Sequence, residues 1–122
     1  MPSSTSYFPR SYAESRDRFL ADAARLGAAV QSYPISDVGS EGEALATDVA
    51  LLGAPDAQRL LIMTSATHGV EGFCGAGCQF SLMDDAAMIK RATQAGVALL
   101  LVHAVNPYGF SWMARTDRKS VV

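Results

Sequence analysis

His68 and Glu71 are the side chains of this sequence whose types and spacing best suit a metal ion. An imidazole and a carboxylate three positions apart can reach one zinc ion from a short turn. Residues 60–63 before them are uniformly apolar, which predicts a buried strand, and the pattern after them turns toward helix. The pair therefore stands where a strand ends and a helix begins, the place where open α/β sheets bind ligands. Because a His-x-x-Glu pattern also arises by chance, the alternatives are a loop histidine bonded to the backbone and an acid that suits the helix dipole.

Glycines and cysteines are concentrated in the same stretch. Four glycines between positions 69 and 77 allow unusual backbone angles and the close approach of a ligand. Cys74 and Cys78 are neighbours on one face if the segment is helical. They could form a thiol nucleophile paired with His68, or a second metal site. We expect them instead to be small apolar residues buried in the core, because a free cysteine is usually buried and packs as a small hydrophobic side chain.

The hydrophobic pattern predicts the elements that position these side chains. Ser11 followed by Glu14 forms a capping-box pattern that starts a helix, and Gly27 ends it. Two extended segments joined by turn residues at 39–42 predict a hairpin at a sheet edge. A strand, a helical crossover and a second apolar strand then predict a βαβ unit with parallel strands. Helices are predicted at 11–26, 73–83 and about 84–95, strands at 30–35, 44–52, 59–64 and 97–105, and a turn at 106–109.

Length and composition limit the class of protein. The chain of 122 residues is one domain or part of one, and its 49% apolar content is enough for a core. A net charge of −2 leaves no basic footprint, so we expect no nucleic-acid partner. No apolar run approaches the roughly 20 residues that span a bilayer, so we expect no membrane partner. The first residues lack the layout of a secretory signal and two cysteines make no disulfide framework, so we expect a reducing, cytoplasmic compartment.

Two short segments resemble the zinc carboxypeptidase superfamily. Residues 67–72 read Thr-His-Gly-Val-Glu-Gly, residues 106–110 read Asn-Pro-Tyr-Gly-Phe, and an arginine follows a few positions on. That superfamily includes carboxypeptidase A-like peptidases and the aspartoacylase and succinylglutamate desuccinylase deacylases. The fuller pattern over residues 7–116 resembles a bacterial branch described as a domain of unknown function.

The resemblance implies roles for particular residues. His68 and Glu71 would be two of three zinc ligands, the third being a histidine beyond the end of this sequence. Arg115 would be the catalytic arginine that polarises the scissile carbonyl and stabilises its oxyanion. His103 could be imagined as the third ligand, because the ends of neighbouring strands converge. The resemblance places that ligand elsewhere, so we expect His103 to be packed under the site, and the general-base glutamate would also lie beyond the chain.

The element order and the resemblance together imply an α/β fold. We expect a three-layer α/β/α arrangement with a mixed, largely parallel central sheet and an edge hairpin. Residues 1–116 would be the amino-terminal part of a zinc-carboxypeptidase-like catalytic domain. Residues 117–122 are predicted to be a non-native tail, because one choice of codons for them matches a common sequencing adapter. The alternative is a basic, flexible native terminus.

The expected function is that of a truncated zinc-dependent hydrolase of amide bonds, with Zn²⁺ as cofactor and a peptide or an N-acyl amino acid as substrate. Because two ligands cannot hold a catalytic zinc tightly, we expect the fragment itself to bind metal weakly and to be inactive. The alternatives are a deacylase of N-acyl amino acids, a non-catalytic binding module on the same fold and, more remotely, a cysteine hydrolase. The sequence leaves the oligomeric state open.

Overall fold

The computed structural model describes residues 3–116, which contain both helices and strands. The predicted non-native tail at 117–122 lies outside the described residues. No helix in the described part is long and apolar enough to cross a membrane. The elements in chain order are η1 Ser4–Tyr7, α1 Tyr12–Arg25, β1 Ala29–Val38, β2 Ala44–Leu52, β3 Arg59–Thr64, η2 Gly69–Glu71, α2 Gly72–Met83, α3 Ala86–Gln94, β4 Val97–His103 and α4 Pro107–Ser111.

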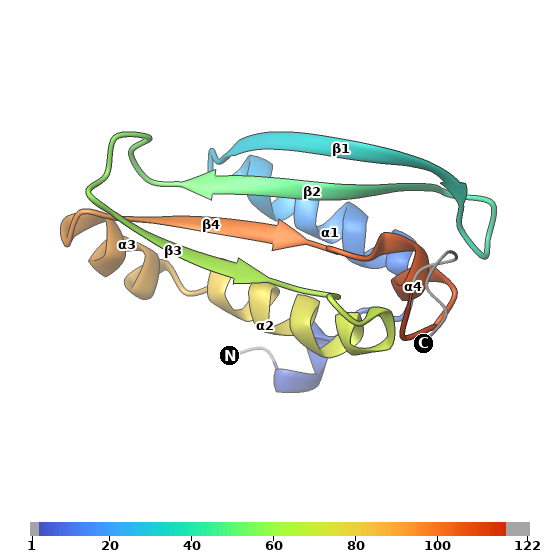
Figure 1. The fold of residues 1–122 in the computed structure, drawn as a ribbon. Helices are drawn as coiled ribbons and strands as arrows, with labels where there is room; N and C mark the ends of the chain where they lie inside the picture. Colours follow the sequence, from blue (N-terminus) through green and yellow to red (C-terminus); the bar gives the residue numbers. More distant parts are fainter. Residues whose placement is uncertain (1–2, 117–122) are drawn as a thin grey trace.

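The four strands form one mixed sheet in the order β1-β2-β4-β3 (Figure 1). β1 and β2 form the predicted hairpin, with β1 at the edge, and β3 and β4 form the predicted parallel pair. β2 also pairs antiparallel with β4, from Asp48 opposite His103 to Leu52 opposite Leu99. The prediction of a largely parallel sheet is therefore wrong, because the hairpin docks against the parallel pair in the opposite direction and makes two of the three pairings antiparallel.

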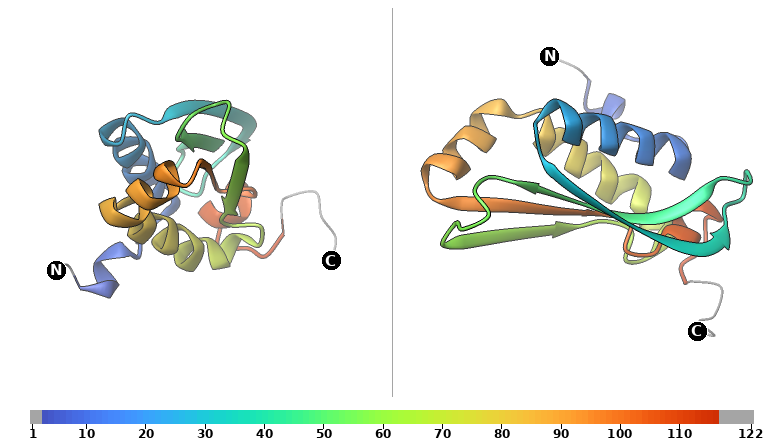
Figure 2. Two further views of the ribbon diagram at one scale, coloured as in Figure 1. Left: turned by 90° about the vertical axis from the view of Figure 1, so that its left-hand side faces the viewer. Right: turned by 90° about the horizontal axis from the view of Figure 1, so that it is seen from above.

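Helices α1, α2 and α3 all lie over one face of the sheet (Figure 2). Residues 3–116 therefore form two layers, and the second helical layer of the predicted three-layer arrangement is not among them. Strand β3 was predicted to be buried, yet Leu60 is 53% exposed and Ile62 is 56% exposed. An apolar run alone does not reveal burial, and β3 is an edge strand with no helix of the described residues over its outer face.

Helix α1 begins after Ser11, as the sequence predicts, and its buried face forms one side of the core. The Ser11 hydroxyl caps the helix by accepting a hydrogen bond from the Glu14 N–H at 3.1 Å. The buried side chains Tyr12, Ser15, Phe19 and Ala23 recur every three or four positions, which places them on one face of the helix. The Tyr12 hydroxyl also fixes α1 to β2, since it donates to the carbonyl oxygen of Ala46 at 2.8 Å and accepts from its N–H at 2.9 Å.

Candidate metal centre

The carboxyl ends of β3 and β4 continue side by side into two short turns that hold the candidate site. The Val105 N–H donates to the Ser65 carbonyl at 2.9 Å, and the Asn106 N–H donates to the Ala66 carbonyl at 2.8 Å. Ala66 and Ala104 have φ angles of 57° and 64°, in the left-handed region that residues with a Cβ rarely adopt. Such conformations cost free energy and are concentrated at functional sites. The backbone geometry alone therefore makes this edge of the sheet a candidate functional site.

His68 and Glu71 lie at the two ends of one 3₁₀ turn. His68 is the N-cap of η2, Glu71 is its last residue, and the Glu71 N–H donates to the His68 carbonyl at 3.1 Å. The His68 side chain is partly buried and the Glu71 side chain is exposed. Neither side chain caps the helix that follows it, and neither forms a hydrogen bond or ion pair with another residue of the described part. Both side chains are therefore available to a ligand. The alternative that the His68 side chain is hydrogen-bonded to the backbone is not found among the described residues.

Two side chains at this turn, those of His68 and Glu71, can coordinate a metal ion. An imidazole and a carboxylate are both zinc ligands by type, so the pair fits zinc as part of a larger set. Within residues 3–116, no group of three or more histidine, cysteine, aspartate or glutamate side chains could hold a metal ion. The described residues therefore supply an incomplete donor set.

The backbone of Arg115 lies directly beside this turn. The Gly69 N–H donates to the Arg115 carbonyl at 3.4 Å. A Cβ at Gly69 would lie 2.0 Å from the carbonyl carbon of Gly109 and 2.4 Å from the carbonyl oxygen of Ala114, so only glycine permits this approach. The Arg115 side chain is exposed. The structure thus brings the backbone of the predicted catalytic arginine to the predicted ligands, although 44 positions separate Arg115 from Glu71 in the sequence.

The segment predicted as a turn at 106–109 is instead the start of helix α4. The Asn106 side chain caps this helix by accepting a hydrogen bond from the Gly109 N–H at 2.9 Å, and Pro107 takes the first helical position. Turns and short capped helices use the same residue types, which explains the error. The helix fixes the segment that leads to Arg115.

Helix α2 is anchored to the strand ends by a residue that the sequence did not single out. The buried Gln79 side chain donates from Nε2 to the carbonyl oxygens of Met63 and Val102, at 2.9 and 3.0 Å. One amide therefore joins α2 to both parallel strands just before the site. The glycines of α2 have a packing reason, because a Cβ at Gly72 would lie 2.5 Å from the Phe110 ring and one at Gly77 would lie 2.7 Å from the Phe8 ring.

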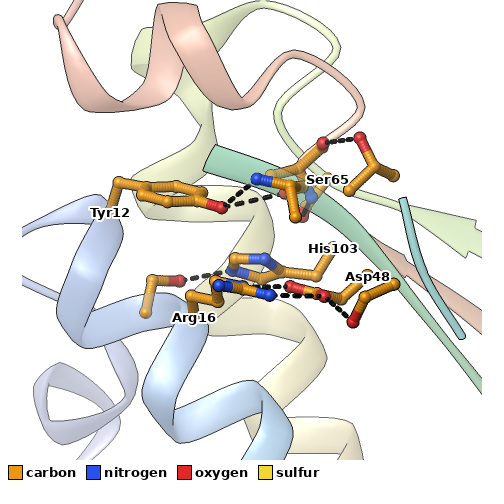
Figure 3. A network of polar contacts seen from close by, with 10 residues as sticks. Tyr12, Arg16, Asp48, Ser65 and His103 are labelled. Atoms are coloured by element: carbon orange, nitrogen blue, oxygen red, sulfur yellow. Dashed lines mark hydrogen bonds and ion pairs between the residues drawn. The ribbon is translucent and has the colours of Figure 1, made fainter. Parts of the chain in front are cut away.

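His103 is completely buried beneath the site, as predicted, and it faces α1 (Figure 3). Its Nε2 lies 2.7 Å from the Ser15 hydroxyl, and its ring stacks on Phe19 with centroids 5.0 Å apart. Its Nδ1 has no hydrogen-bond partner among residues 3–116. Burial lowers the pKa of His103 to about 4, and the nearby Asp48 opposes this only in part. The imidazole is therefore neutral at pH 7 and serves the core.

A buried ion pair beside His103 was missed by the sequence reasoning. Asp48 is fully buried, and Arg16 reaches it from α1 with Nε 2.8 Å from Oδ2 and Nη2 3.3 Å from Oδ1 (Figure 3). The Ser32 hydroxyl donates to the same carboxylate. The available signal was an acidic residue in the middle of an apolar strand, since such a residue is rarely buried unless it is paired.

The prediction that Cys74 and Cys78 are core residues is wrong, because both are exposed. The core face of α2 is formed by Ala76, Phe80 and Met83, and the cysteines project from the other side of the helix. Partial burial and then the neighbouring Cys74 thiol raise the pKa of Cys78. The surroundings of Cys78 therefore do not activate it as a nucleophile.

The described residues thus form an α/β domain with a four-stranded, mostly antiparallel mixed sheet, and the sequence belongs to a family. The family described as "Protein of unknown function (DUF2817)" matches residues 8–121, so the chain is a member of it. The expected match to a domain of unknown function is confirmed. No curated protein matches the sequence at a significant level.

Solved structures share the fold at low sequence identity. A zinc-dependent exopeptidase from Parabacteroides distasonis matches with a TM-score of 0.53 and 12% identity, over 98% of this chain and 47% of that one. The glutaminyl cyclase of Tannerella forsythia matches with a TM-score of 0.51 and 14% identity, over 93% of this chain and 46% of that one. The glutaminyl cyclase of Porphyromonas gingivalis matches with a TM-score of 0.51 and 19% identity, over 84% and 40%. The chain spans less than half the length of each, and at these identities the likeness extends to the fold alone.

Proposed function

We propose that this chain is part of a zinc-dependent hydrolase of amide bonds, to which it supplies His68 and Glu71 as metal ligands. The observation that carries the proposal is the 3₁₀ turn at the carboxyl end of β3. This turn presents an imidazole and a carboxylate that bond to no other described residue. The fold is shared with a zinc-dependent exopeptidase, which is consistent with the proposal, but the chemistry rests on the turn.

Each residue near the turn has a role that its position supports. His68 and Glu71 hold the ion, and a bound zinc ion supplies Lewis acidity for the attack of water on a carbonyl group. We assign to Arg115, whose backbone carbonyl accepts a hydrogen bond from the Gly69 N–H, the role of offering positive charge to the oxygen that becomes negative during this attack, a contribution of about 3 kcal/mol for one well-placed donor. We place the third ligand and the general base outside residues 3–116, so the chain by itself binds metal weakly and is inactive.

The substrate is an amide, either at the end of a peptide or in an N-acyl amino acid. A carboxypeptidase would release a free C-terminal amino acid from a peptide, whereas a deacylase would release an acid from a small N-acyl amino acid. In the intact gene product, hydrolysis of both kinds of substrate should be measured with and without a chelator. Loss of hydrolysis with chelator, and not with thiol alkylation, is expected.

Metal binding by residues 1–122 tests the step that carries the proposal. Titration with Co²⁺ should broaden backbone amide NMR signals around His68 and Glu71 before it affects the rest of the domain. His68→Ala and Glu71→Gln should each weaken this localised binding by about tenfold or more, since each removes one of two ligands. Glu41→Gln, which changes an exposed acid in the β1–β2 turn, is the matched control and should bind as the parent does. Broadening that is centred elsewhere, or that is unchanged in both ligand variants, would refute the assignment.

A further inference from the structure

Two cysteines on the outer side of helix α2 take no part in the core or in the turn that carries His68 and Glu71. Cys74 and Cys78 are both free and exposed. The completely buried Met83 follows Cys74 by nine positions, which is about two and a half turns at 3.6 residues per turn. Cys74 therefore lies on the side of α2 that faces away from the core, and its thiol is accessible to a ligand from solvent.

The spacing of the two cysteines makes their side chains neighbours. Both lie within α2, Gly72–Met83, and side chains four positions apart on a helix have Cβ atoms about 5–6 Å apart. The raised pKa of Cys78 agrees with this proximity. Burial is the largest cause of the increase, and the neighbouring Cys74 side chain adds to it through its charge and a hydrogen bond. The two thiols therefore interact with each other.

Helix α2 is held in a fixed orientation, which keeps the pair on the surface. On its inner side, the buried Gln79 amide donates to the Met63 and Val102 carbonyls at 2.9 and 3.0 Å. Beside the pair, Gly77 lies against the N-terminal segment, and a Cβ there would lie 2.7 Å from the Phe8 ring. Because α2 is packed in both places, the two thiols are already arranged for a ligand and lose little conformational freedom when it binds.

The spacing suits a bridging ion better than a disulfide bond. A disulfide requires Cβ atoms about 3.8 Å apart, and helical neighbours with Cβ atoms about 5–6 Å apart do not provide this while the helix is intact. An ion with metal–sulfur bonds of about 2.3 Å holds two sulfur atoms up to about 4.6 Å apart. Two cysteines on one helix can span that distance without unwinding it.

We propose that Cys74 and Cys78 form a binding site for the soft monovalent cation Cu(I). A structural Zn²⁺ site needs four ligands, and no group of three or more suitable side chains is found among residues 3–116. Soft thiolate ligands select Cu(I), which is stable with two of them in a linear arrangement. On binding, two S–H bonds break, two Cu–S bonds form and two protons pass to solvent, while copper and sulfur keep their oxidation states. The proposal does not depend on metal binding at His68 and Glu71.

Anaerobic titration with Cu(I) tests this site. The purified, reduced chain should compete for Cu(I) with the chromogenic chelator bicinchoninate, whose colour reports the copper that the protein does not hold. We expect one Cu(I) per chain, and native mass spectrometry should find it on single chains. Cys74→Ser and Cys78→Ser should each lower the affinity by about tenfold or more, because each removes one of two ligands. Ser81→Ala, which changes an exposed residue on the next turn of α2, is the matched control and should bind as the parent does.

A variant with a displaced thiol separates chelation from binding by two independent thiols. Cys78→Ser combined with Ser81→Cys keeps two cysteines on α2 but places them seven positions apart, about 10.5 Å along the helix axis. One ion cannot bridge this distance, so the double variant should bind Cu(I) as weakly as Cys78→Ser alone.

Far-UV circular dichroism shows whether each variant is folded. Alkylation of both thiols in the folded parent needs no substitution and should abolish Cu(I) binding, so it decides if a variant fails to fold. Unchanged affinity in Cys74→Ser and Cys78→Ser, or full affinity in the variant with the displaced thiol, would overturn the proposal. Copper held only between two chains, or Cu(I) binding that survives alkylation, would overturn it as well.

Discussion

The buried imidazole of His103 makes the stability of this domain depend on pH. The side chain is completely buried, with the Phe19 ring stacked on one side and the Ser15 hydroxyl at hydrogen-bond distance from Nε2. Its Nδ1 has no hydrogen-bond partner among the described residues. Burial lowers its pKa from 6.5 to about 4, the nearby Asp48 opposes this decrease, and the positive charge of Arg16 adds to it. Between these two pH values the unfolded chain binds a proton that the folded chain excludes.

The sign and size of the effect follow from this difference. The pKa of His103 is lower in the folded chain than in the unfolded chain. Its contribution to the free energy of unfolding is therefore complete above pH 6.5 and is lost as the pH falls toward 4. At about 1.4 kcal/mol per pKa unit, the interval between 6.5 and about 4 corresponds to roughly 3.5 kcal/mol. That is a large fraction of the 5–15 kcal/mol by which domains are typically stable.

Urea unfolding between pH 7.5 and 4.5 measures this loss. His103→Phe keeps an aromatic ring in the core and removes the titrating group, so its free energy of unfolding should decline less steeply with falling pH. Ser15→Ala combined with His103→Phe controls for the hydroxyl that the single variant leaves without its partner. Other acids titrate in this range in all three proteins, so the difference in slope is the quantity to compare. Parallel curves for the parent and His103→Phe, or an NMR titration of His103 near pH 6.5, would refute the reasoning.

Three further predictions concern the supports of the site. Arg16→Met should cost about 3–5 kcal/mol of stability in urea unfolding, because it leaves the Asp48 carboxylate buried without its ion partner; a loss below 1 kcal/mol would mean that water reaches the carboxylate. Tyr12→Phe should cost about 1–3 kcal/mol, since its hydroxyl satisfies both an N–H and a carbonyl of β2; a neutral change would show that these groups find other partners. Gly69→Ala should displace the 3₁₀ turn that carries His68 and Glu71, because its Cβ would lie 2.0 Å from the Gly109 carbonyl carbon; unchanged Co²⁺ broadening at the turn would contradict this.

The sequence predicted the local features of the fold well. The bounds of β2 at 44–52 and of β3 at 59–64 agree with the prediction, because alternating or continuous apolar runs end at turn residues. The cap of α1 at Ser11 also forms as expected, and Asp85 caps α3 in the same way, since capping depends on residues three positions apart. The shared turn of His68 and Glu71 belongs to the same class of local feature.

Features that depend on distant segments were not predictable in the same way. The antiparallel pairing of β2 with β4 joins segments about 50 positions apart, and no local pattern specifies on which side a hairpin docks. The exposure of β3 depends on its place in the strand order, which an apolar run does not record. The contact between the Arg115 carbonyl and the Gly69 N–H likewise depends on where α4 packs. Cys74 is the exception, because helical periodicity alone could have placed it opposite the buried Met83.

The exposed strand β3 has a practical consequence for handling this protein. Its outer rim presents main-chain donors and acceptors next to the apolar side chains of Leu60, Leu61 and Ile62, with Arg59 as the one charged residue of the strand. A rim of this kind can recruit an extended segment from a neighbouring molecule and so begin intermolecular sheet growth. Dilute samples, and the substitution Leu60→Lys or Ile62→Lys, should therefore extend the working life of the purified chain without changing the turn that carries His68 and Glu71.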